Sequence, residues 1–215
     1  PKVFGDPCVN VVKHLAVIAE CSLPSPSFQN STSWDFTLMD GLVGDFVDSQ
    51  QLQQETHQVS SKPAVMSFST PPQWMYATAQ PVDIPDDPSQ VMWNYEQGTA
   101  FIDSSLQQVG DSYARIAAWY TGGGFIDEFN VLHKSGHDFS DVFKIWEVGN
   151  EVEAEHSMTV EYYTRMYDRI VNTIRAQPLA TVNPPDMEFM GLALQYHKEW
   201  NWYKYFLNSS KHEPG

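Results

Sequence analysis

The stretch Val142-Phe143-Lys144-Ile145-Trp146-Glu147-Val148 is a short run of mainly apolar residues, which is typical of a buried β-strand. A similar run, Ala64-Val65-Met66-Ser67-Phe68-Ser69, ends at Thr70-Pro71-Pro72, because proline cannot continue a central strand. The run Phe189-Met190-Gly191-Leu192-Ala193-Leu194 is the third of this kind. The sequence therefore predicts at least three buried strands.

Helical periodicity separates these runs. Apolar residues recur at steps of three and four after Asp35, Asp103 and Thr159, and we expect Asp103 and Thr159 to be N-caps. Gly122-Gly123-Gly124 is expected to stop the second helix, residues 125–140 to form a loop, and residues 200–206 to form an aromatic helix. Strands that alternate with helices predict an α/β fold with a parallel sheet. Both a doubly wound sheet and part of a (β/α) barrel fit this pattern.

Charge and composition exclude some classes of function. The chain has 12 basic and 27 acidic residues and a formal net charge of -15, which disfavours nucleic acid as a partner. No apolar run approaches the roughly 18 to 20 residues that cross a bilayer, so we expect no membrane span. Seven Trp and ten Tyr suit a carbohydrate site, although most of these rings are expected to be core. Nothing in the sequence indicates an oligomeric state.

Cysteines and glycosylation motifs bear on the compartment. Cys8 and Cys21 are the only cysteines and lack CxxC spacing, which leaves a disulfide and two buried thiols equally open. The chain has sequons at Asn30-Ser31-Thr32 and Asn208-Ser209-Ser210. They favour a secreted or extracellular protein only slightly, because about one sequon is expected by chance.

The dipeptide Asn150-Glu151 follows the strand quoted first. In both architectures the chemistry lies at the carboxyl ends of the strands. A glycosidase needs a protonated carboxylic acid beside the scissile oxygen, and a neighbouring amide can bind the sugar 2-hydroxyl. Adjacent side chains of a strand point to opposite faces, so both reach one site only if the chain bends, which Gly149 permits. The ordinary alternative is a solvated carboxylate at a strand end.

Other residues are candidates for binding substrate. Trp74, after the prolines, would form a wall of a sugar site or cover the rim of the barrel. Tyr196 follows the third run, and His137 lies in the loop before the quoted strand. His133 and His137 lie near several carboxylates, but we expect neither a metal nor a cofactor. Glu147 is expected to be buried, with a partner such as Arg or Tyr, and to support the site.

A wider set of motifs resembles glycoside hydrolase family 39, in clan A of the (β/α)8 retaining glycosidases. WEVGNEVEAEH (146–156) resembles the acid/base motif on the fourth strand of that family, and SFSTPPQWM (67–75) resembles its third strand with the following exit. The resemblance runs from about Ser33 to the last residue. Its other parts are the loop WYTGGGFIDEFNVLHKSGHDF (119–139), the helix EYYTRMYDRIVNTIR (161–175), the fifth strand FMGLALQ (189–195) and SSKHEPG (209–215) before the sixth.

The resemblance implies the first five β/α units of a TIM-type (β/α)8 barrel. Residues 1–215 would form the N-terminal portion of one barrel domain, with 1–33 as an irregular or poorly matched lead-in. It implies retaining hydrolysis of an O-glycosyl bond, with Glu151 as the general acid/base and Asn150 as a sugar-binding neighbour. The nucleophile of the family is a Glu on the seventh strand, and this sequence stops before the sixth. We therefore expect the chain by itself to be inactive.

The sequence also departs from the family pattern. Gly149 stands where relatives carry a bulkier apolar residue, and Val152-Glu153 replaces a small or acidic pair. A catalytically inactive half-barrel that binds carbohydrate, or acts as an interaction module, is the alternative interpretation. The sugar and the linkage are not determined by the sequence.

Overall fold

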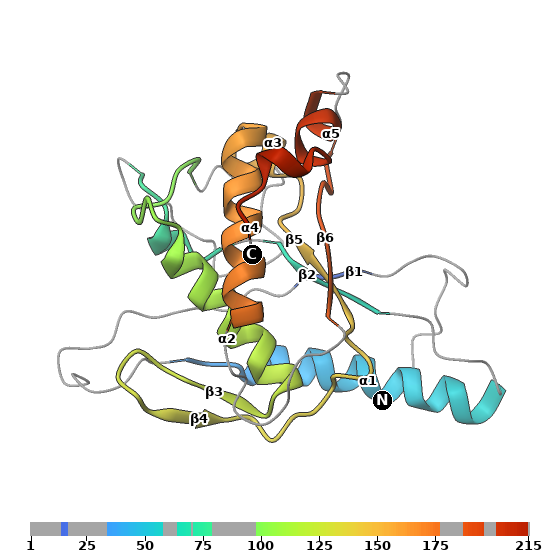
Figure 1. Cartoon of the computed structure of the whole chain (residues 1–215). Helices are drawn as coiled ribbons and strands as arrows, with labels where there is room; N and C mark the ends of the chain where they lie inside the picture. Colours follow the sequence, from blue (N-terminus) through green and yellow to red (C-terminus); the bar gives the residue numbers. More distant parts are fainter. Residues whose placement is uncertain are drawn as a thin grey trace.

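The structure is a computed structural model of the chain. It describes residues 14–16, 34–57, 64–69, 71–78, 98–176, 187–195 and 201–214. In this part of the chain a sheet of four parallel strands has helices between successive strands (Figure 1). The strands are β1 (His14–Ala16), β2 (Val65–Phe68), β5 (Ile145–Val148) and β6 (Glu188–Met190). The predicted α/β class with a parallel sheet is confirmed.

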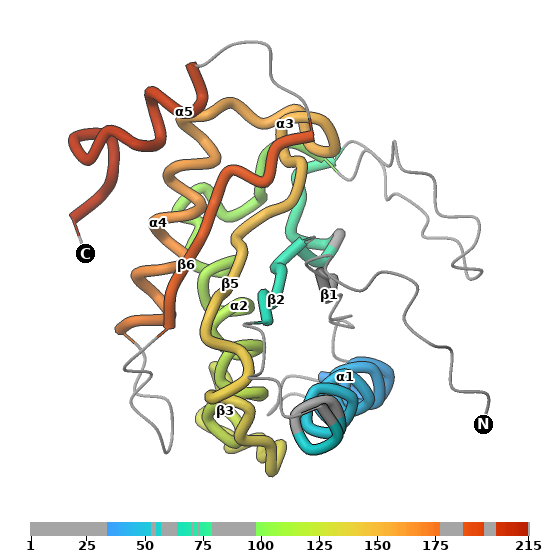
Figure 2. Tube along the Cα trace, turned by 90° about the vertical axis from the view of Figure 1, so that its right-hand side faces the viewer, coloured from blue at the N-terminus to red at the C-terminus, as the bar shows by residue number. Residues whose placement is uncertain are grey.

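The strands lie side by side in the order in which they occur along the chain, β1-β2-β5-β6. A doubly wound sheet contains a point where this order reverses, and the described sheet contains no such reversal. In register, Val148 lies opposite Phe68 and Met190 lies opposite Glu147, so the carboxyl ends of β2, β5 and β6 share one edge (Figure 2). Strand β1 falls within residues 1–33, for which the sequence predicts an irregular or poorly matched lead-in.

Two helices cover one face of the sheet, α2 (Gln107–Thr121) and α4 (Val160–Ala176). The ring of Phe68 stacks on Tyr113 of α2 at 4.4 Å and lies 4.8 Å from the ring of Trp146. Gly110 allows the two helices to approach, because a Cβ there would lie 2.7 Å from the Thr173 hydroxyl oxygen. This face therefore holds the apolar core of the sheet.

Helix α1 (Thr37–His57) lies at the end of the sheet where β5 begins (Figures 1 and 2). Phe46 of α1 stacks on Phe143, just before β5, with the ring centroids 6.0 Å apart. Asp40 accepts a hydrogen bond of 2.9 Å from the indole of Trp119 at the end of α2. The helix predicted from the periodicity after Asp35 is confirmed.

The prediction that residues 125–140 form a loop is wrong, because most of a β-hairpin lies within this range. Strands β3 (Gly124–Ile126) and β4 (Leu132–Lys134) pair antiparallel. The buried carboxylate of Asp127 holds the turn by accepting from the backbone N–H groups of Phe129 at 2.9 Å and Val131 at 2.8 Å. The strands have three residues each, too few for a recognisable alternation of apolar and polar positions.

The predicted ends of other elements are partly confirmed. Thr159 caps α4, and its hydroxyl oxygen accepts from the Tyr162 N–H at 3.3 Å. Asp103 is not the N-cap of α2, which begins at Gln107, although its carboxylate accepts from the Gln108 N–H at 2.9 Å. The last helix, α5 (Asn201–Phe206), buries Trp202. None of the described helices has the length and apolar character to cross a bilayer.

A histidine fastens the C-terminal segment to α4. His212 follows the short helix η3 (Ser209–Lys211), and its Nδ1 lies 2.6 Å from a carboxylate oxygen of Asp168, while its Nε2 contacts the carbonyl oxygen of Phe206. Both partners are acceptors, so both contacts are hydrogen bonds only when the ring is protonated. Burial lowers the pKa of His212, but the bonds to Asp168 and Phe206 and the Asp168 charge outweigh it and raise the pKa.

We expect His212 to make the stability of the protein depend on pH. Because the pKa of His212 is raised in the folded protein, its contribution to stability is complete below its unfolded pKa of 6.5. This contribution is lost as pH rises through the folded pKa. The difference in free energy of unfolding between wild type and His212→Gln, measured by urea denaturation, should therefore shrink from about pH 6 to about pH 9. In an Asp168→Asn background this pH dependence should be much smaller. If the difference in free energy of unfolding between wild type and His212→Gln did not change with pH, His212 would not be held in its protonated form by Asp168 and Phe206.

Candidate functional site

The carboxyl end of β5 bends sharply. Strand β5 ends at Val148, and helix α3 (Val152–Glu155) begins four residues later. Gly149 has φ 73 and Glu151 has φ 48, so both lie in the left-handed region. For a residue other than glycine this conformation costs about 1 to 2 kcal/mol and persists only where the surroundings hold it. The bend that Asn150 and Glu151 need to share one site is therefore present.

Backbone hydrogen bonds fix this bend between two neighbouring strands. The Gly149 N–H donates to the Phe68 carbonyl at 3.0 Å, and the Glu151 N–H donates to the Ala193 carbonyl at 2.6 Å. Asn150 also forms a parallel bridge with Ala193, beyond the end of β6. The segment 149–151 is thus held by the ends of both β2 and β6.

Glycine is favoured at position 149. A Cβ there would lie 2.8 Å from Cγ1 of Val152 and 3.3 Å from Cε2 of Tyr163, and the positive φ disfavours a side chain as well. Helix α3 and Tyr163 of α4 fill the space that such a side chain would need.

The side chains of Asn150 and Glu151 are partly buried, and within the described part of the chain neither takes part in a hydrogen bond or ion pair. Two further carboxylates lie nearby on α3. Burial, followed by the charges of Glu151 and Glu153, raises the pKa of Glu155. Glu153 accepts a hydrogen bond of 2.7 Å from the Gln195 N–H. The site is therefore rich in carboxyl groups, and Glu151 is not locked in a structural ion pair with any described residue.

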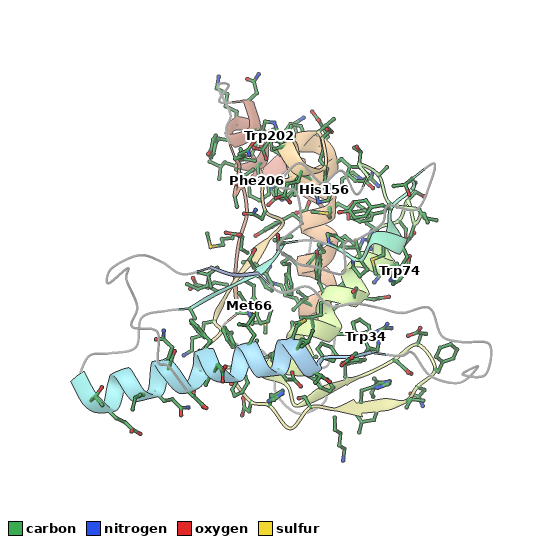
Figure 3. All side chains as sticks on the ribbon, turned by 180° about the vertical axis from the view of Figure 1, so that it is seen from behind. Trp34, Met66, Trp74, His156, Trp202 and Phe206 are labelled. Atoms are coloured by element: carbon green, nitrogen blue, oxygen red, sulfur yellow. The ribbon has the colours of Figure 1, made fainter. Side chains whose placement is uncertain are left out.

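His156, which ends the WEVGNEVEAEH motif, joins the segments that follow β2 and β5 (Figure 3). Its ring stacks on Tyr76 at 5.0 Å, with Nδ1 3.1 Å from the Gly98 carbonyl and Nε2 3.4 Å from the Tyr76 hydroxyl. Burial lowers the pKa of His156, although the bond to Gly98 opposes the shift. A neutral ring satisfies both contacts, because Nδ1–H donates and Nε2 accepts. Sequence reasoning did not assign His156 a role.

Trp74 lies on the short helix η1 (Gln73–Met75), which follows β2 at the same edge of the sheet (Figure 3). Its ring is partly buried against the core. Its indole N–H is buried and has no hydrogen-bond partner among the described residues. Trp74 therefore lies on the carboxyl side of the sheet, as expected both for a wall of a sugar site and for a ring that covers the rim of a barrel.

His137 does not lie with Glu151. It sits near the start of β5, at the opposite end of the sheet, where its ring stacks on Phe139 at 5.0 Å and on Tyr120 at 5.7 Å. Its Nε2 lies 3.2 Å from the Asp40 carboxylate, without the geometry of a directed hydrogen bond. The structure therefore separates His137 from Asn150, Glu151 and Trp74. Tyr196 lies outside the described residues.

Glu147 is almost fully buried, with 2% of its surface exposed, as the sequence predicts. Its carboxylate accepts a hydrogen bond of 2.8 Å from the hydroxyl of Ser67, its neighbour in register on β2. One partner of Glu147 is thus a hydroxyl from the adjacent strand. This polar pair ties β2 to β5 below the bend at Gly149.

Comparison with known proteins gives no match. No protein-family model matches the chain, and no curated protein or solved structure matches it significantly. Among the described residues, no three His, Cys, Asp or Glu side chains are grouped to hold a metal ion. The site must therefore be interpreted from its own residues.

We expect Gly149→Ala to destabilise the protein by about 1 to 3 kcal/mol, because the new Cβ adds strain at a positive φ and a contact with Val152. Gly44→Ala is the control, since Gly44 lies within α1 and a Cβ there meets nothing within 4 Å. That change should be neutral or stabilise the protein by up to about 1 kcal/mol. Urea denaturation measures both, and equal effects would show that the bend does not require glycine.

Proposed function

We propose that this chain contributes to a (β/α)8 glycosidase barrel and that Glu151 is its acid/base residue in the hydrolysis of O-glycosides. One observation carries the proposal. The Asn150-Glu151 pair follows a left-handed Gly149 at the carboxyl end of a central parallel strand, and no described residue pairs with the Glu151 carboxylate. This is the place where barrel enzymes carry their catalytic groups.

The arrangement of strands supports the barrel. Consecutive β/α units of a barrel place each strand beside the previous one and parallel to it. Strands β1, β2, β5 and β6 follow this order, with α1, α2 and α4 between them. The order also argues against the doubly wound alternative, whose ligand site lies where the order reverses.

The chemistry assigned to Glu151 is proton transfer. Its carboxyl group would donate a proton to the leaving glycosidic oxygen and then accept one from the attacking water. Other carboxyl groups lie beside it: burial and the charges of Glu151 and Glu153 raise the pKa of Glu155. Asn150 would bind the 2-hydroxyl of the sugar.

Retaining hydrolysis also needs a carboxylate nucleophile about 5 to 5.5 Å from the acid/base group. The family resemblance assigns this nucleophile to a seventh strand, whereas the motifs of this sequence resemble the family only up to the segment before the sixth strand. The proposal therefore gives this chain the acid/base part of the site. The crowding of Glu151, Glu153 and Glu155, together with the net charge of -15, favours a neutral glycoside over a polyanionic one.

An iminosugar inhibitor tests the role of Glu151, because its ammonium group pairs with an active-site carboxylate. Isothermal titration with iminosugars of xylose and glucose configuration should show binding by the wild type. We expect Glu151→Gln to weaken it by roughly 10- to 100-fold, as for the loss of a charged hydrogen bond. Glu188→Gln should change affinity less than about twofold, since Glu188 is exposed and lies at the start of β6.

Two outcomes would contradict the proposal. If wild type binds no iminosugar, or if Glu151→Gln binds as tightly as wild type, Glu151 is not the acid/base residue. A neutral oligosaccharide that binds equally to wild type and to Glu151→Gln, in the absence of iminosugar binding, would instead favour the alternative, a carbohydrate-binding protein without hydrolytic activity.

A further inference from the structure

The hydroxyl of Tyr163 joins two strand ends. Tyr163 lies on α4 with 1% of its surface exposed. Its O–H donates to the carbonyl of Val148 at 2.8 Å, and its oxygen accepts from the N–H of Leu192 at 3.0 Å. Val148 is the last residue of β5, and Leu192 lies two residues beyond β6. One side chain thus fixes the distance between the two strands where they leave the sheet.

Two glycines make room for this contact. A Cβ at Gly191 would lie 2.5 Å from the Tyr163 hydroxyl oxygen, and one at Gly149 would lie 3.3 Å from its Cε2. Two rings of α5 also lie near the phenol, Phe206 at 5.5 Å and Trp202 at 6.0 Å between ring centroids. These neighbours hold the phenol in one orientation.

The Tyr163 hydroxyl must be neutral to make both bonds. Burial raises the pKa of Tyr163 far above that of a free phenol, although the bond from Leu192 opposes the shift. The group therefore keeps its proton and can donate and accept at once.

The two residues that the hydroxyl contacts lead directly to Glu151. Leu192 is followed by Ala193, whose carbonyl accepts from the Glu151 N–H at 2.6 Å. Val148 is followed by the bend at Gly149. Leu192 has φ 63 and Glu151 has φ 48, so each strand end contains a left-handed residue that needs external support.

We propose that Tyr163 is a positioning residue, whose hydroxyl locks the ends of β5 and β6 together and so holds Glu151 in place at the carboxyl edge of the sheet. This inference rests on the proposed function for its catalytic meaning. The geometric part does not, because both hydrogen bonds of the Tyr163 hydroxyl are to backbone groups of this chain.

Tyr167 provides a matched control. It lies one turn further along α4, and its hydroxyl donates to the Phe189 carbonyl of β6 at 3.1 Å. It therefore resembles Tyr163 in residue type, helix and neighbouring strand, but it contacts only one strand and lies further from the edge that carries Glu151. Replacing either tyrosine with phenylalanine removes a single oxygen atom.

Amide hydrogen exchange, followed by NMR on the 215-residue chain, tests the inference. We expect Tyr163→Phe to speed exchange at the Glu151 and Leu192 amides by about tenfold or more, as for the loss of a buried hydrogen bond. Tyr167→Phe should leave both amides within about twofold of wild type, which a general loss of stability would not do. Equal exchange at Glu151 in the two variants would overturn the proposal.

If Tyr163→Phe does not fold, Gly191→Ala displaces the same hydroxyl with a methyl group and should give the same local acceleration; no acceleration in that folded variant would also overturn the proposal. The iminosugar titration then separates the two claims. Exchange that responds to Tyr163 in a chain that binds no iminosugar supports the positioning role and rejects the glycosidase. Weaker iminosugar binding in Tyr163→Phe, but not in Tyr167→Phe, supports both.

Discussion

The absence of a side chain at Gly149 is the constraint on which the carboxyl edge of the sheet depends. With φ 73 and Val152 2.8 Å from the position of a Cβ, the chain turns out of β5 where a residue other than glycine would be strained. The turn brings the Glu151 N–H to the Ala193 carbonyl and starts α3, which in turn leads to His156 and its contacts with Tyr76 and Gly98. The segments that follow β2, β5 and β6 are thus linked through one backbone bend.

The sheet combines apolar packing on one face with a buried polar pair on the other. Phe68 and Trp146 pack against the helices, while Ser67 and Glu147, their neighbours in sequence, are bonded to each other across β2 and β5. A buried carboxylate without a partner would be costly, so the pair constrains the register of the two strands as well as satisfying Glu147. That register places the end of β2 beside Gly149, whose N–H bonds to Phe68.

The sequence predicts an element correctly where neighbouring residues in the chain decide its structure. The periodicity after Asp35 and Thr159 predicted α1 and α4, and the apolar runs predicted β2, β5 and β6. The hairpin at Asp127 was missed because a buried carboxylate, and not a pattern of apolar residues, holds it. His137 was grouped with the site because it precedes β5 in sequence, yet it packs at the opposite end of the sheet.

The sequence by itself determined the α/β class, most of the elements and the position of Asn150-Glu151 after a strand, because helical and strand periodicity and glycine signals are local. Only the tertiary structure decided that the strands follow chain order, that Gly149 is required by Val152 and Tyr163, and that the Tyr163 hydroxyl joins β5 to β6. These features depend on residues up to 80 positions apart, as between β2 and β5, that meet only after the helices pack on the sheet. No local pattern encodes such contacts, since their energy exists only when both partners are in place.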